Sequence, residues 1–278
     1  MLKEITEFVV KNRETITSIL KDEKFDNIAQ KAKENWITYV STKKKSSLFG
    51  IDSSFNTKKY QGLFLWATDV ISINIKNETR AREFKFGLGR ENEELSKQAA
   101  MLEIDACKQT TDHADYVLMD GSLYSHFTSK LTPLRNVKDV LTKNNNVVFI
   151  GKTSNSRKQF EKYGSIAGDI FYYNHAVRKQ GFSKLFVDSS HGASQLITSI
   201  YARLSEDIPL MKIELMGGDH TEDDIKEIMD ALLSESVGGY PRCLKMAHNE
   251  CKISSKNLEN LVHILGLTNE IGSRELLE

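Results

Sequence analysis

The first forty residues repeat apolar positions with the period of an amphipathic helix. Ile5, Phe8 and Leu20 belong to one such set, and a second set runs from Phe25 to Trp36. Apolar residues three or four positions apart form a stripe along one side of a helix. The pattern therefore predicts two N-terminal helices within residues 1–40.

Runs rich in β-branched and aromatic residues follow these helices. The segment SSLFGID predicts a short strand that ends at Asp52, and residues 62–76 and 82–89 predict two longer strands. Val, Ile, Thr, Phe and Trp favour extended backbone because their side chains pack well on a pleated surface. The first half of the chain is thus predicted to open as a meander of strands.

Helical and extended patterns alternate in the rest of the chain. We expect helices at 91–113, from after Gly121 to about Leu141, around 156–163, at 222–234, and twice after the turn Gly-Gly-Tyr-Pro near residue 240. Strands are expected at 116–120, ending in a turn at Asp120–Gly121, and at 147–151, 168–173, 184–188, 196–204 and 210–216. This mixture predicts an α/β or α+β fold.

No linker divides the sequence. The three prolines are scattered, and no tract rich in Ser, Gly, Pro or Gln separates two compositional halves. We therefore expect a single domain over residues 1–278, with N-terminal helices in 1–40, a core in 48–252, and a C-terminal helix and tail in 253–278.

Composition restricts the class of protein without identifying a function. Lys plus Arg equals Asp plus Glu, 38 against 38, so no global positive charge attracts a polyanion. A local basic channel or a partner protein can still hold nucleic acid. Three cysteines without paired metal spacing indicate a reducing compartment. With no secretory signal and no apolar run of about 20 residues, we expect a cytoplasmic protein with no membrane association.

Two aspartates stand where predicted strands end, and both precede small residues. Asp52 lies in GIDSS and Asp120 in LMDGS. If both strands share one sheet, the carboxylates converge at one edge, where oxygen ligands suit Mg²⁺ or Mn²⁺. Two such ions, about 4 Å apart, activate water and stabilise a leaving oxygen in known phosphodiester hydrolases. The alternative is structural, because Asp-Ser and Asp-Gly are common turn formers.

Two further candidates lie on predicted helices. Glu103 sits beside the apolar stripe of helix 91–113, so its side chain is able to reach the sheet edge, whereas Asp105 points elsewhere and is the expected bystander. His248 falls on a helix face that looks buried. It is either a core histidine with satisfied hydrogen bonds or a ligand or proton shuttle.

The segment GKTS at 151–154 has the ending of a phosphate-binding loop. The full motif needs a glycine five positions before Gly151, and Asn146 occupies that position. An ATP-binding loop is therefore excluded. Lys152, at a strand end, is either a contact for a substrate phosphate or a solvated lysine. The segments VDSSHGAS and GGDHTEDD match no nucleophile or metal motif, and we assign them no chemistry.

Taken together, these motifs resemble the NurA family of nucleases. Asp52 in GIDSS, Glu103, Asp120 in LMDGSL, Lys152 in IGKTS and the later GYPRCLKMAH occur in the family's order, from about residue 48 to residue 252. LMDGSL and the GYP…AH segment are the most specific parts of the resemblance. Two positions depart from the family pattern, because Ser53 replaces the more usual glycine and Cys243 replaces a bulkier residue.

The resemblance implies a specific function. It implies a ribonuclease H-like core with a mixed sheet flanked by helices, and a Mn²⁺-dependent nuclease (Mg²⁺ as an alternative) with two ions. The metal-binding carboxylates would be Asp52, Glu103 and Asp120, with His248 as the accompanying catalytic and metal-binding histidine. Lys152 and Tyr240 would line the DNA channel.

The resemblance also implies partners. It implies a homodimer that works with a HerA-type hexameric translocase in DNA end resection, as a 5′–3′ exonuclease and single-strand endonuclease. Two alternatives remain at the level of sequence: a catalytically silent adaptor that docks on DNA or a translocase, and an unrelated phosphoesterase acting on small substrates.

Overall fold

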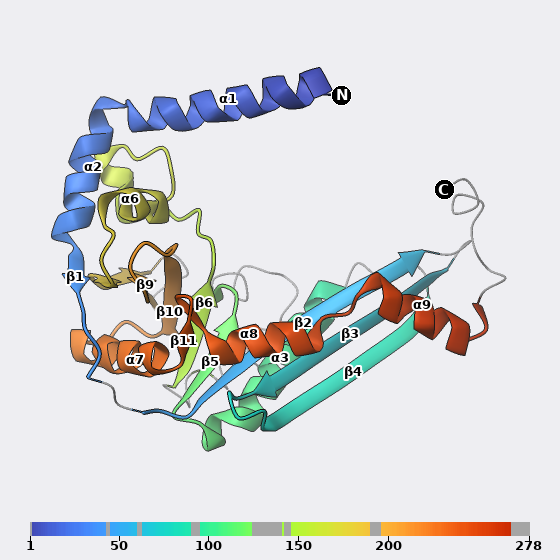
Figure 1. Cartoon of the computed structure of the whole chain (residues 1–278). Helices are drawn as coiled ribbons and strands as arrows, with labels where there is room; N and C mark the ends of the chain where they lie inside the picture. Colours follow the sequence, from blue (N-terminus) through green and yellow to red (C-terminus); the bar gives the residue numbers. More distant parts are fainter. Residues whose placement is uncertain are drawn as a thin grey trace. The chain divides into compact units, whose positions relative to one another are not determined.

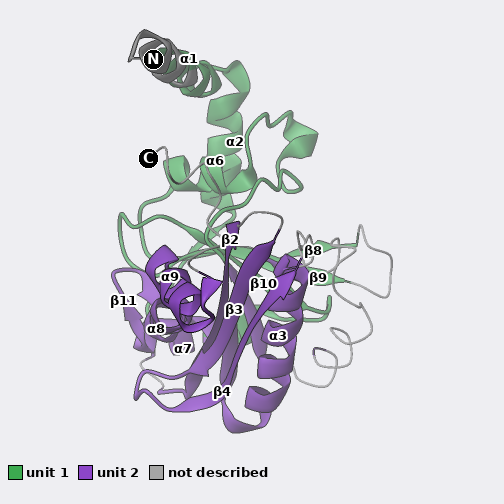
Figure 2. Cartoon of the chain, turned by 90° about the vertical axis from the view of Figure 1, so that its right-hand side faces the viewer, with its two compact units in different colours: residues 1–40, 151–226 green, residues 41–150, 227–278 purple. Residues whose placement is uncertain are grey.

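The computed structural model describes residues 2–42, 45–59, 63–89, 95–123, 141, 146–189 and 196–267. The chain divides into two compact units, shown in different colours in Figure 2. Unit 1 contains residues 1–40 and 151–226, and unit 2 contains residues 41–150 and 227–278. Each unit is therefore assembled from separate stretches of sequence, and the expectation of a single domain stays a prediction.

Unit 1 begins with helices α1 (Leu2–Leu20) and α2 (Glu23–Glu34). Its sheet has the order β1-β7-β9-β10, and β8 also pairs with β9; all these pairs are antiparallel. The strands are β1 (Trp36–Thr38), β7 (Gly181–Ser183), β8 (Phe186–Asp188), β9 (Ile197–Arg203) and β10 (Met211–Met216). The two predicted N-terminal helices are confirmed. Helix α2 ends at Glu34, so Trp36, which was predicted to belong to this helix, is the first residue of β1.

Two predictions within unit 1 are wrong. Residues 168–173 form the start of helix α6 (Asp169–Ala176), and the predicted helix at 156–163 is only the 3-10 turn η2 (Glu161–Tyr163). The aromatic run FYY favours extended backbone locally. Tyr172 and Tyr173 are nevertheless buried against Ile28 and Ala32 of α2, so tertiary packing outweighs the local preference.

Unit 2 contains a mixed sheet in the order β6-β5-β2-β3-β4. Its strands are β2 (Leu48–Lys59), β3 (Phe64–Ile73), β4 (Thr79–Gly89), β5 (Tyr116–Asp120) and β6 (Val147–Gly151). The chain first forms the antiparallel meander β2-β3-β4 and then adds β5 parallel to β2 and β6 parallel to β5. The predicted meander is confirmed.

Helices cover both faces of this sheet (Figures 1 and 2). Helix α3 (Leu95–Thr110), extended by the turn η1 (Thr111–His113), lies on one face, and α8 (Arg242–Cys251) and α9 (Ser255–Ile264) lie on the other. Ala247 and Cys251 of α8 pack on Ile71 and Ile73 of β3. The two faces of the sheet therefore present side chains to different helices.

The remaining elements agree with the sequence in type. Helix α7 (Glu222–Ser234) occupies the predicted range, and the short pair β11 (Ser236–Val237) and β12 (Tyr240–Pro241) encloses the Gly-Gly turn. The helix predicted between Gly121 and Leu141 lies almost entirely outside the described residues. Among the described helices, none is long and apolar enough to cross a bilayer.

One correction affects the site directly. The strand predicted to end at Asp52 continues to Lys59, because β2 pairs with β3 over ten residues, from Gly50↔Ile73 to Lys59↔Phe64. Asp52 therefore lies inside a strand and is not part of a turn. The turn-forming explanation for Asp52 is wrong.

Candidate metal centre

Two neighbouring parallel strands place Asp52 and Asp120 side by side. Ile51 of β2 is in register with Met119 of β5, and each aspartate is the next residue along its strand. Side chains at matching positions of adjacent strands leave the sheet on the same face. Pairing of β2 with β5 is thus sufficient to bring two carboxylates together that are far apart in sequence.

The backbone after Asp120 turns away at a glycine. Gly121 has φ of +113°, a conformation that L side chains rarely adopt, and its N–H donates to the carbonyl of Ile150 at 3.0 Å. The predicted Asp-Gly turn is therefore present, and it leaves Asp120 at the open end of β5.

A second glycine lets helix α8 approach the sheet closely. A Cβ on Gly50 would lie 2.5 Å from the backbone carbon of Cys243 and 2.5 Å from the backbone nitrogen of Leu244. Gly50 and Asp52 are two residues apart and share a face of β2. The absent side chain at 50 therefore allows the start of α8 to rest on the strand, and His248 one turn later reaches Asp52.

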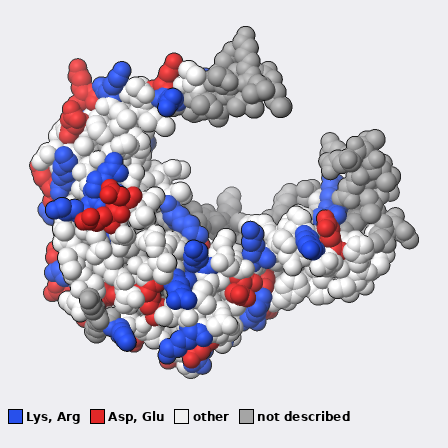
Figure 3. All heavy atoms as spheres, viewed as in Figure 1, with Lys and Arg blue, Asp and Glu red and all other residues white. Residues whose placement is uncertain are grey.

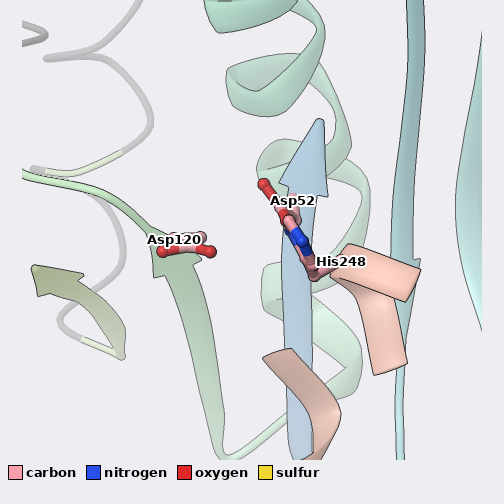
Figure 4. Close-up of side chains that lie close together, drawn as sticks. All are labelled: Asp52, Asp120 and His248. Atoms are coloured by element: carbon pink, nitrogen blue, oxygen red, sulfur yellow. The ribbon is translucent and has the colours of Figure 1, made fainter. Parts of the chain in front are cut away.

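Asp52, Asp120 and His248 form a compact group. Nδ1 of His248 lies 2.8 Å from Oδ2 of Asp52, and one ligand atom from each of the three residues lies within 4.8 Å of the others. Figure 4 shows Asp52 and His248 in contact, with Asp120 at the end of β5 beside them. The His248 side chain is 56% exposed, so the core-histidine explanation is wrong.

Glu103 lies next to this group but reaches β2 from helix α3, on the other face of the sheet. Oγ of Ser53 donates to Oε1 of Glu103 at 2.5 Å, and the Ser53 N–H donates to Oδ1 of Asp52 at 2.8 Å. Ser53 thus links the two carboxylates. Sequence reasoning treated Ser53 only as a departure from the family pattern and missed this contact, because Glu103 is 50 positions away.

Burial and like charge raise the pKa values of Asp52 and Glu103. Burial raises the pKa of Asp52 and the charge of Asp120 raises it further, while the hydrogen bond to His248 opposes both. Burial also raises the pKa of Glu103 to about 8, against the hydrogen bond from Ser53. A divalent cation would relieve this repulsion. Two carboxylates and an imidazole are donors that suit Mn²⁺, so the residues fit such an ion.

The other predicted residues lie in different environments. Burial, followed by the charges of Asp120 and Asp52, raises the pKa of Tyr240, which places this phenol in the field of the carboxylates. Asp105 is exposed on α3, as expected of a bystander. Lys152 is exposed, directly follows β6 and belongs to unit 1. Its DNA-binding role, like the ligand roles of the other residues, stays a prediction.

Comparison with known proteins places this site in context. Residues 46–253 match the family model of the NurA domain. A curated relative, the DNA double-strand break repair nuclease NurA of Saccharolobus solfataricus, is 26% identical over an alignment that covers 90% of this chain and 89% of the relative.

Solved structures give the same result at the level of fold. The NurA nuclease from Sulfolobus solfataricus superposes with a TM-score of 0.79 at 21% identity, covering 96% of this chain and 97% of that one. A structure of NurA bound to dAMP and manganese superposes with a TM-score of 0.63 at 12% identity, covering 96% of each chain. The predicted α/β fold with a mixed, helix-flanked sheet is confirmed, whereas the ribonuclease H-like core stays an implication of the family resemblance.

Proposed function

Because the chain belongs to the NurA family, we propose that it is a metal-dependent DNA nuclease that acts in double-strand break repair. One observation carries the proposal most directly: Asp52, Asp120 and His248 present ligand atoms within 4.8 Å of one another. The name of the relative from Saccharolobus solfataricus and the manganese and dAMP of a structural relative support the same chemistry.

We propose that Asp52, Asp120 and His248 hold Mn²⁺, with Mg²⁺ as an alternative, and that Glu103 completes a site for two ions. When bound, such cations act as Lewis acids toward a water molecule and a phosphodiester oxygen. Asp52 also fixes the orientation of the His248 ring through Nδ1. Ser53 holds the carboxyl of Glu103 beside β2.

Two further side chains are proposed to contact the substrate. Tyr240 lies in the field of Asp120 and Asp52, and a tyrosine hydroxyl can donate to a phosphate oxygen. Lys152 contributes a positive charge near a strand end. Basic and acidic side chains are intermingled on the face drawn in Figure 3, so we expect DNA to be held by a few local contacts.

The mode of cleavage and the partners are also proposals. We propose 5′–3′ exonuclease and single-strand endonuclease activity in DNA end resection, by a homodimer that works with a HerA-type translocase. The exposed apolar side chains of α1 support contact with another chain, because Val10 is 48%, Ile16 is 49% and Leu20 is 37% exposed.

End-labelled DNA incubated with the purified protein, with and without Mn²⁺, tests the proposal. We expect cleavage with Mn²⁺, and a loss of about a thousandfold or more in Asp120→Asn, which keeps the shape of the side chain but removes a ligand charge. Asp105→Asn is the matched control on exposed surface and should cut like the wild type. Absence of cleavage by a folded, Mn²⁺-loaded wild type would favour the adaptor alternative.

A further inference from the structure

Unit 2 contains a cavity outside the candidate metal centre. It has a volume of about 340 Å³ and lies between strands β3 and β4 and the junction of helices α8 and α9. This volume falls at the small end of the range for ligand-binding pockets. The cavity therefore suits a small ligand or one flat group of a larger ligand.

Part of its wall is aromatic and aliphatic. Phe84 of β4 lines one side and is 47% exposed, and Leu261 and Ile264 of α9 line another. An aromatic side chain that stays half-exposed beside a cavity leaves a ring surface available for stacking. The walls thus favour a planar apolar face on the ligand.

One part of the cavity wall is polar. Asp69 of β3 is directly opposite Phe84 in the strand register, and its Oδ2 accepts from Nη2 of Arg82 at 2.9 Å. The same Nη2 donates to the carbonyl of Glu250 at 3.2 Å. Oδ1 of Asp69 is buried and has no hydrogen-bond partner within the part of the chain that the structure describes. A hydrogen-bond donor, Arg82, and an acceptor, Asp69, therefore lie beside the ring of Phe84.

The charges that line the cavity balance. Arg82 and Lys252 are matched by Asp69 and Glu250. A site for a phosphate would need an excess of positive charge. A neutral, planar group with hydrogen-bonding edges fits the balance better, and a nucleobase is such a group.

The cavity and the metal centre lie on the same face of the sheet, on neighbouring strands. Asp69 pairs with Ser54, which follows Asp52 by two residues on the same face of β2. The backbone carbonyl of Glu250, which accepts from Arg82 at the cavity, lies two residues beyond His248 on α8. A DNA strand with a phosphate at the metal centre therefore has a neighbouring base within reach of the cavity.

We propose that this cavity, bounded by Phe84, Asp69, Arg82 and Leu261, is a subsite that binds one unpaired nucleobase of the DNA substrate. The base stacks on Phe84 and presents its polar edge to Asp69 and Arg82. This proposal rests on the proposed nuclease function and adds a specific contact to it. It also gives a reason for acting on single strands, because a paired base cannot enter the subsite.

The test is binding of a labelled single-stranded oligonucleotide of about fifteen nucleotides to the full chain, in EDTA so that no cleavage occurs. Phe84→Ala should weaken binding about tenfold, in line with the loss of one stacked base. Leu88→Ala is the matched control, because Leu88 lies on the same face of β4 and is 44% exposed but does not line the cavity. It should bind within about twofold of wild type. Phe86 is unsuitable because its ring packs against Phe84, with 5.9 Å between the ring centroids.

A second measurement ties the effect to a base. Oligonucleotides with a single abasic sugar, moved one position at a time, should show one position at which wild-type binding weakens. In Phe84→Ala, and in Phe84→Leu as a second variant, an abasic sugar at that position should not weaken binding further. The stacking interaction between the base and Phe84 is already lost in these variants.

Each outcome separates the two proposals. Equal affinities for wild type and Phe84→Ala, or no sensitive abasic position, would overturn the subsite, and intact Mn²⁺-dependent cleavage in the same preparation would leave the nuclease function standing. Equal losses in Phe84→Ala and Leu88→Ala, with a fall in molecular mass, would instead show a contact between copies and overturn the subsite. No DNA binding and no cleavage by the wild type would overturn both proposals.

Discussion

Asp52 and Ser53 are neighbours in β2, but their side chains leave the sheet on opposite faces. Asp52 meets His248 of α8, and Ser53 meets Glu103 of α3. The centre is thus built from both sides of one strand. Glu103 is strongly affected, because burial raises its pKa to about 8 and the nearby charges of Asp52 and Asp120 add to the effect.

This raised pKa predicts how the stability of the metal-free protein depends on pH. The folded-state pKa of about 8 lies above the ordinary pKa of 4.5 for a glutamate, so the folded protein binds more protons than the unfolded chain between these values. The contribution of protonated Glu103 to the free energy of unfolding is fully present below about pH 4.5 and is lost as pH rises to about 8. Around the middle of this window the free energy of unfolding should fall by about 1 kcal/mol for each pH unit.

Urea unfolding in EDTA from pH 5 to pH 9 measures this dependence. In Glu103→Gln, which cannot ionise, the fall in the free energy of unfolding with pH should be clearly smaller. Ser53→Ala should keep the dependence, because burial, its main cause, remains. Parallel curves for wild type and Glu103→Gln would show that the carboxyl of Glu103 is already ionised in the folded protein.

At the scale of elements, the contact between α8 and β2 positions His248. Gly50 permits this contact, and Cys243 and Leu244 of α8 are both completely buried there. The position of the histidine thus depends on a residue that has no side chain.

Gly50→Ala is therefore expected to destabilise the fold. The added Cβ meets backbone atoms that cannot rotate away, and overpacking of this kind costs about 1–3 kcal/mol. Gly89→Ala is the control, because its Cβ meets nothing within 4 Å, and it should change stability by less than about 0.5 kcal/mol. Denaturant unfolding of the two variants measures this difference in stability. Equal midpoints would contradict the close contact between β2 and α8.

The elements also show what sequence can predict. Helix α7 and the C-terminal pair of helices were predictable because their apolar periodicity is local. The extension of β2 past Asp52 was not, because the pairing partner in β3 supplies it. Helix α6 was predicted as a strand, because its aromatic residues are held by packing against α2. The convergence of Asp52 and Asp120 followed from motif and resemblance, whereas the Ser53–Glu103 contact needed coordinates.

At the scale of the whole molecule, the chain carries exposed apolar side chains on α1 that a monomer leaves in water. If the protein is a homodimer, light scattering will give twice the 31.6 kDa of one chain. Ile16→Asp should reduce that mass if α1 is part of the contact, with little change in the unfolding midpoint of the remaining monomer, because Ile16 is 49% exposed. A monomeric wild type at micromolar concentration would contradict the homodimer.

The measurement that tests the central claim most directly is a titration of Mn²⁺ into the metal-free protein, followed by the loss of the free Mn²⁺ signal in electron paramagnetic resonance. The account predicts saturable binding by the wild type and by Asp105→Asn. It predicts binding weakened at least about tenfold in Asp52→Asn and in Asp120→Asn, since each removes a charged ligand. Unchanged binding in both of these folded variants would contradict a metal centre built on Asp52 and Asp120.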